Sequence, residues 1–239
     1  MELLRQNILS VHLPARDRIA KYNIPILALL AANAVPLAGV LFLGWDAFVI
    51  VLFYWAENLA VGFYNVLKMA FAKVGHPIEH LGKLFMIPFF IVHYGGFTAI
   101  HGFFILAIFS KGEQGPPIIS GKSWPCVFVF VQLLINVIGH IITIIPPTVR
   151  LGILSLFASH GVSFVYNYFI KGEYAHAKLN KLMSQPYSRI FVMHITILGG
   201  GFGLMILGSP LALLLVLVVL KTVIDVKMHL LEHKKACKV

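Results

Sequence analysis

The stretch from Asp46 to Ala72 reads DAFVIVLFYWAENLAVGFYNVLKMAFA, and its charged residues are Asp46, Glu57 and Lys68. About 20 mostly apolar residues in a helix cross the hydrocarbon core of a bilayer, because a helix rises about 1.5 Å per residue and the core is roughly 30 Å thick. The stretch is long enough and apolar enough for one crossing. We therefore predict a transmembrane helix at 46–72.

The composition of the whole chain agrees with this prediction. Of its 239 residues, 59% are hydrophobic and 12% are charged, and the mean hydropathy is +0.88. A soluble domain carries about 25% charged residues, so a soluble globular domain is excluded. The net charge of +10 would suggest nucleic acid in a soluble protein. Here most Lys and Arg lie at the ends of apolar stretches, where they face lipid phosphates. We expect membrane lipids as partners and no nucleic acid.

Similar apolar stretches recur on both sides of residues 46–72 along the chain and predict an all-α, polytopic transmembrane bundle. We expect seven spans, or six if one segment is re-entrant or lies flat on the membrane. Basic residues occur on both sides, so the positive-inside rule does not decide the orientation. The predicted spans are 22–43, 46–72, 83–109, 124–145, 148–170, 189–207 and 211–231.

The division into parts follows from these spans. Residues 1–21 predict an interfacial N-terminal segment, residues 22–233 a single transmembrane domain, and residues 234–239 a basic tail. Between the third and fourth spans, residues 111–123 are rich in Gly and Pro, which is typical of a loop.

Ionisable side chains inside the spans are the strongest functional signal. Such groups cost several kcal/mol in a bilayer and generally mark a pathway, a site or a paired contact. Glu57, His101 and His160 lie within three different predicted spans. The last span carries a polar stripe in which each member follows the previous one by four residues, so that all share one helical face. Its members are Lys221, Asp225, His229 and His233.

Counting residues inward from the tail side, with seven alternating spans, brings these groups to common depths. Imidazole and carboxylate together are the ligands of zinc, iron, manganese or copper. We therefore predict a divalent metal site inside the membrane, with Lys221 or His194 in its outer shell. The predicted ligands are Glu57, His101, His160, Asp225, His229 and His233.

A catalytic version of this site predicts a metal-dependent membrane enzyme, hydrolytic or oxidative, that acts on a lipidic or small substrate. The metal would activate water or oxygen while a spare carboxylate moves protons. The run from His229 to His233 also matches the His-x-x-Glu-His pattern of one metallopeptidase class, in which the glutamate is the base. The predicted catalytic residues are Glu57, Lys221 and Glu232.

Other interpretations of the same residues stay open. The ionisable groups could form the relay of a proton-coupled transporter. His93 and His140 fall at one depth and could hold a haem in an electron-transfer protein. The network could also be wholly structural, in a homo-oligomer or a subunit of a larger membrane complex.

Three sequence blocks carry a resemblance. Trp55-Ala56-Glu57-Asn58, His93-Tyr94-Gly95-Gly96-Phe97 with His101, and Lys221-Thr222-x-x-Asp225-x-x-x-His229 resemble a family of uncharacterised bacterial membrane proteins. The resemblance implies a helical bundle in the bacterial inner membrane and supplies no activity. The chain is also similar, more distantly, to the alkaline-ceramidase-like membrane hydrolases, which have seven spans and a zinc ion held by histidines. Their Ser-x-x-x-His element has no clear match in the second span.

Overall fold

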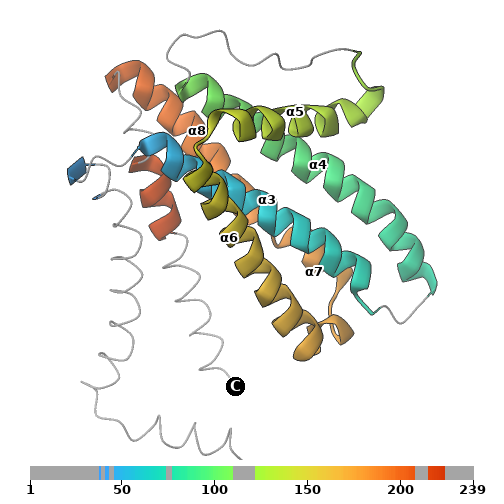
Figure 1. Ribbon diagram of the computed structural model, residues 1–239. Helices are drawn as coiled ribbons and strands as arrows, with labels where there is room; N and C mark the ends of the chain where they lie inside the picture. The colour runs from blue at the N-terminus through green and yellow to red at the C-terminus, as the bar shows by residue number, and fades with distance from the viewer. Residues whose placement is uncertain are drawn as a thin grey trace, which may run out of the picture. The chain divides into compact units, whose positions relative to one another are not determined.

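The computed structural model describes residues 38, 41–42, 46–73, 77–109, 122–207 and 215–223 (Figure 1). The chain divides into two compact units, one formed by residues 1–45 with 217–239 and the other by residues 46–216. All regular structure in the described ranges is helical. The elements of the larger unit are α3 (Ala47–Phe71), α4 (Pro77–Phe109), η1 (Cys126–Phe128), α5 (Val129–Ile144), α6 (Pro147–Ser163), η2 (Phe164–Ile170), η3 (Glu173–Ala175), α7 (Leu179–Ser184) and α8 (Tyr187–Leu207).

Four of these helical stretches are long and apolar enough to cross a membrane: Ala47–Phe71, His80–Phe109, Cys126–Ile144 and Pro147–Ile170. They coincide with the second to fifth predicted spans. Helix α8 has nearly the bounds predicted for the sixth span, although it is not among these four. Nearly all of the predicted first span, and more than half of the seventh, lie outside the described residues. The prediction of an all-helical membrane protein is thus confirmed for the described ranges, and a count of seven spans is not supported.

Local sequence explains where α3 begins and ends and where α4 begins. The Asp46 carboxylate accepts a hydrogen bond from the Phe48 backbone N–H at 2.9 Å and caps the start of α3. The Lys83 ammonium donates to the carbonyls of Ala70 and Ala72 at 3.0 and 2.6 Å, which satisfies the open end of that helix. Helix α4 begins at Pro77, earlier than the predicted boundary at 83, because proline suits the first position of a helix.

Helices α3 and α4 pack side by side in opposite directions. The Trp55 indole N–H donates to the Thr98 carbonyl at 2.8 Å, and the Tyr94 hydroxyl donates to the Asn58 carbonyl at 3.0 Å. The later residue of α3 therefore pairs with the earlier residue of α4. Gly102 makes the close approach possible, since a Cβ at this position would lie 2.7 Å from the Trp55 ring.

Helix α5, in contrast, runs in the same direction as α4. A Cβ at Gly96 would lie 3.3 Å from Phe130, and a Cβ at Gly102 would lie 2.7 Å from Val137. The order of residues is the same on both helices, so the pair is parallel (Figure 1). Two consecutive spans joined by a loop would be antiparallel. The alternation of direction that was assumed for all seven predicted spans therefore does not hold for α4 and α5.

The remaining long helices of this unit, α6 and α8, continue the alternation of direction that α3 and α4 begin. Helix α6 runs parallel to α3, because Phe53 packs at Gly152 and Tyr64 packs at Gly161. Helix α8 runs parallel to α4, since Tyr187 meets His93 and the later His194 meets His101. In chain order α3, α4, α6 and α8 thus point alternately one way and the other, and α5 is the exception.

A disulfide crosslink tests the parallel arrangement. In a variant with Cys126→Ser and Cys237→Ser, we expect Gly96→Cys with Phe130→Cys to oxidise readily, because the Cβ atoms would lie 3.3 Å apart, close to the 3.5–4.5 Å typical of disulfides. A protease site is inserted within residues 111–121. After cleavage, the crosslinked halves of the protein stay joined on a non-reducing gel.

The control pair is Ile105→Cys with Phe130→Cys, which an antiparallel hairpin would bring together. Crosslinking of this pair, with none of the first, would contradict the parallel arrangement.

Candidate functional site

Helix α8 carries side chains that reach polar partners on the neighbouring membrane helices. Arg189 reaches Glu57 of α3, and His194 reaches His101 of α4. Arg189 and His194 are five residues apart in α8. Since each residue of a helix is rotated by about 100° from the previous one, the two side chains point in different directions and meet different neighbours. Polar groups of α3 and α4 therefore both meet side chains of α8.

Two imidazole rings, His101 of α4 and His194 of α8, face each other in the described part of the chain. The His101 Nε2 atom lies 3.1 Å from the His194 Nδ1 atom. His101 is only 2% exposed, whereas the His194 side chain is exposed. The other ring nitrogen of His101, Nδ1, is the one buried side-chain N or O atom in the described part of the chain that has no hydrogen-bond partner. Buried polar groups nearly always have a partner, so His101 marks an incomplete polar site.

A second cluster surrounds the Glu57 carboxylate. The Arg189 Nη1 atom lies 2.8 Å from Glu57 Oε1, and the His160 Nε2 atom lies 4.0 Å from the same oxygen. The three side chains are 22%, 44% and 30% exposed, in the order Glu57, Arg189, His160. The guanidinium compensates the carboxylate charge directly, so Glu57 is bound in an ion pair with His160 at its edge.

His93 and His140, the predicted haem ligands, lie at different levels. His93 Nδ1 is 2.9 Å from the Tyr187 hydroxyl. Val137 of α5 lies beside Gly102 of α4, which fixes a common level on the two parallel helices. His140 follows Val137 by three residues, and His93 precedes Gly102 by nine. At 1.5 Å per residue the two are about 18 Å apart along the helices. The two histidines were predicted at one depth because the spans that carry them were taken to be antiparallel. Since α5 runs parallel to α4, they are separated instead.

The structure brings together only part of the predicted metal site. Glu57 and His160 are neighbours, and His101 contacts His194, which was expected in the outer shell. Across residues 46–73, 77–109, 122–207 and 215–223, no three His, Cys, Asp or Glu side chains form a group that could hold a metal ion. Lys221 lies in the helical segment 215–223, in the other compact unit. The remaining predicted residues lie outside the described ranges: Asp225, His229, Glu232 and His233.

Arg189 and Tyr187 are the members of the network that sequence reasoning missed. Arg189 was interpreted as the charged boundary of the sixth predicted span. One signal could have identified it, since a carboxylate in a membrane helix requires a cation nearby and Arg189 begins a neighbouring apolar stretch.

The described residues are helical, and four of their helical stretches are long and apolar enough to cross a membrane, which indicates a helical membrane protein. Its residues 15–239 match the model of a family of unknown function, DUF6498. The chain belongs to this family, which confirms the expected membership in an uncharacterised family. No curated protein and no solved structure matches the chain.

Proposed function

We propose that the protein binds a divalent transition metal ion between α4 and α8 through His101 and His194, as part of a metal-dependent membrane enzyme. The observation that carries the proposal is the pair of imidazole nitrogens 3.1 Å apart, one of them on a ring that is 2% exposed. Zinc, iron, manganese and copper all accept imidazole nitrogen.

The separation of the two nitrogens supports this proposal. Bonds of 2.0–2.1 Å to a tetrahedral ion place two ligand nitrogens about 3.3 Å apart, close to the observed 3.1 Å. An ion between the rings would therefore require only a small shift of the side chains and would replace the shared proton. A catalytic site usually has three protein ligands and an open position. His101 and His194 supply two of them.

A bound metal ion would activate water or polarise a carbonyl or phosphoryl group of a lipidic or small substrate. Glu57 would then move protons rather than bind the metal, because Arg189 already holds its carboxylate at 2.8 Å. His160, at 4.0 Å from the same oxygen, could take up a proton from that carboxylate through a modest side-chain movement. Asp225, His229 and His233 stay predicted ligands.

A proton-coupled carrier is the second candidate, and the Glu57–His160 contact favours it. A carboxylate and an imidazole 4.0 Å apart inside a membrane bundle could pass a proton between them after a modest side-chain movement. This function needs no metal, so the two candidates differ in a measurable property.

We also infer six crossings rather than seven, with α5 as the segment that does not reverse the chain. The alternation of α3, α4, α6 and α8 supports this topology, and so does the parallel pairing of α5 with α4. The bacterial inner membrane, and assembly as a homo-oligomer or in a larger complex, stay predictions.

A cobalt titration tests the proposal. We expect metal-stripped protein in detergent to bind Co²⁺ saturably at equimolar amounts and to develop the visible absorption of cobalt in a low-coordinate nitrogen site. Absence of saturable binding would overturn the metal site. Metal-free protein that takes up substrate into vesicles only under a proton gradient would favour the carrier, and a Soret band in the untreated protein would favour haem.

A further inference from the structure

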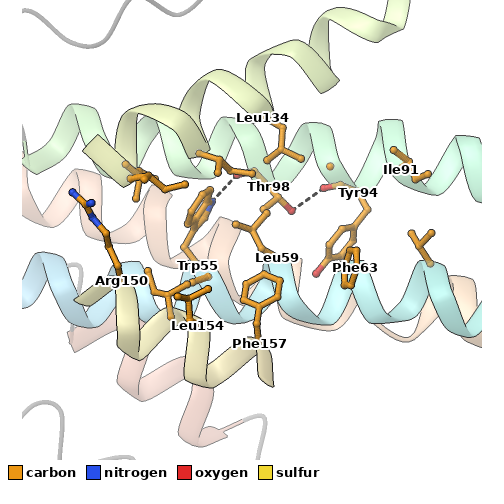
Figure 2. A pocket seen from close by; sticks show the side chains of 18 of the residues that line it. Trp55, Leu59, Phe63, Ile91, Tyr94, Thr98, Leu134, Arg150, Leu154 and Phe157 are labelled. Atoms are coloured by element: carbon orange, nitrogen blue, oxygen red, sulfur yellow. Dashed lines mark hydrogen bonds between the residues drawn. The ribbon is translucent and has the colours of Figure 1, made fainter. Parts of the chain in front are cut away.

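An apolar cavity of about 770 Å³ lies between α3, α4, α5 and α6 (Figure 2). Its size falls within the range of about 300–1,000 Å³ that is usual for small-molecule sites. Aliphatic and aromatic side chains of all four helices form the wall. Among them are Leu59, Phe63, Ile91, Leu134, Leu154 and Phe157.

Three polar side chains of the wall already donate hydrogen bonds within the protein. The Trp55 indole donates to the Thr98 carbonyl, and the Thr98 hydroxyl donates to the Tyr94 carbonyl (Figure 2). The Tyr94 hydroxyl donates to the Asn58 carbonyl. These three side chains therefore have no free hydrogen-bond donor to offer a ligand in the cavity. Burying a polar group there would cost free energy, so the wall selects hydrocarbon.

Arg150 is the charged residue of the wall, and Figure 2 shows it at one end of the cavity, with Ile91 toward the other. Its Nε atom donates to the Ile145 carbonyl at 3.1 Å, which fixes the guanidinium beside the α5–α6 turn. Arg150 lies two residues inside the predicted start of its span, where basic residues are expected to face lipid headgroups. A guanidinium binds phosphate through paired hydrogen bonds.

We propose that this cavity binds one acyl chain of an anionic phospholipid, whose phosphate is held by Arg150. The apolar wall would contact the acyl chain, and the Arg150 guanidinium at one end of the cavity would bind the phosphate of the headgroup. The proposed lipid site is separate from the proposed metal site, because His101 and His194 do not line the cavity. Either proposal can fail without the other.

Trp55 lines the cavity and can report its occupant. In a Trp45→Phe/Trp124→Phe variant, Trp55 is the remaining tryptophan. This variant is placed in phosphatidylcholine vesicles that contain a small fraction of phosphatidylglycerol, with bromine on the acyl chains of one lipid or the other. Bromine quenches tryptophan fluorescence on contact. We expect brominated phosphatidylglycerol to quench Trp55 with about fivefold preference over brominated phosphatidylcholine, as one basic residue at a membrane surface provides.

Arg150→Gln is expected to abolish this preference, and Lys171→Gln, at the other end of the same helical stretch, is expected to retain it. Ile138 lines the cavity, and the larger side chain of Ile138→Phe would fill part of it. This variant should therefore lower quenching by both lipids. Equal quenching by the two lipids in the parent protein would overturn the proposal, and so would an unchanged preference in Arg150→Gln.

Discussion

His101→Ala and His194→Ala are each expected to lower the affinity for Co²⁺ by more than about 100-fold, since loss of outer-shell partners alone costs 10- to 100-fold. The reason is geometric, because the two rings face each other at 3.1 Å and removal of either leaves one imidazole. The measurement is the cobalt titration followed by visible absorption. His194→Ala is the cleaner variant, because its side chain is exposed and its loss leaves no cavity in the core.

His176→Ala is the matched control. His176 is an exposed histidine between η3 and α7, and its removal should leave cobalt binding unchanged. Thermal unfolding of each variant separates loss of the site from loss of the fold. A folded His194→Ala protein that binds cobalt as tightly as the parent protein would show that this pair is not a metal site.

Arg189→Gln is expected to destabilise the protein by about 1–3 kcal/mol, somewhat less than the 3–5 kcal/mol lost when one partner of a fully buried pair is removed. Glu57 would keep its charge without the guanidinium that now lies 2.8 Å away. The smaller value is expected because Arg189 is 44% exposed. The loss should appear as a lower midpoint of thermal unfolding in detergent.

The double variant Arg189→Gln/Glu57→Gln tests the cause. It removes both charges, so we expect it to recover much of the stability that Arg189→Gln loses. Arg150→Gln, which has no carboxylate partner in the described residues, serves as a control for the loss of a positive charge. If the double variant instead lost as much stability as the Arg189→Gln and Glu57→Gln variants lose together, the ion pair would not be the cause.

The apolar runs of the sequence predicted the helices well and their directions less well. The stretch 46–72 predicted α3 to within a residue, because length and apolarity are what a bilayer requires of a span. Hydropathy contains no information on direction, and alternation was assumed instead. The parallel contact of Gly96 with Phe130 depends on tertiary packing, which no single-segment pattern records.

The candidate site was predictable in its residue types and not in its pairings. Glu57, His101 and His160 all take part in the network, since ionisable groups in spans need partners. The Trp55–Asn58 and His93–Phe97 blocks, however, serve largely for packing. Trp55 lies against Gly102, and Tyr94 lies against Gly62. Such contacts require glycine opposite an aromatic ring on another helix, and the sequence does not show which glycine meets which ring.

The most direct measurement is the elemental content of the protein purified from membranes without added metal or chelator. The proposed site predicts near-stoichiometric zinc, iron, manganese or copper in the parent protein and in His176→Ala, and its loss in His101→Ala/His194→Ala. Protein that is folded and free of these metals, or metal that remains in the folded double variant, would contradict it.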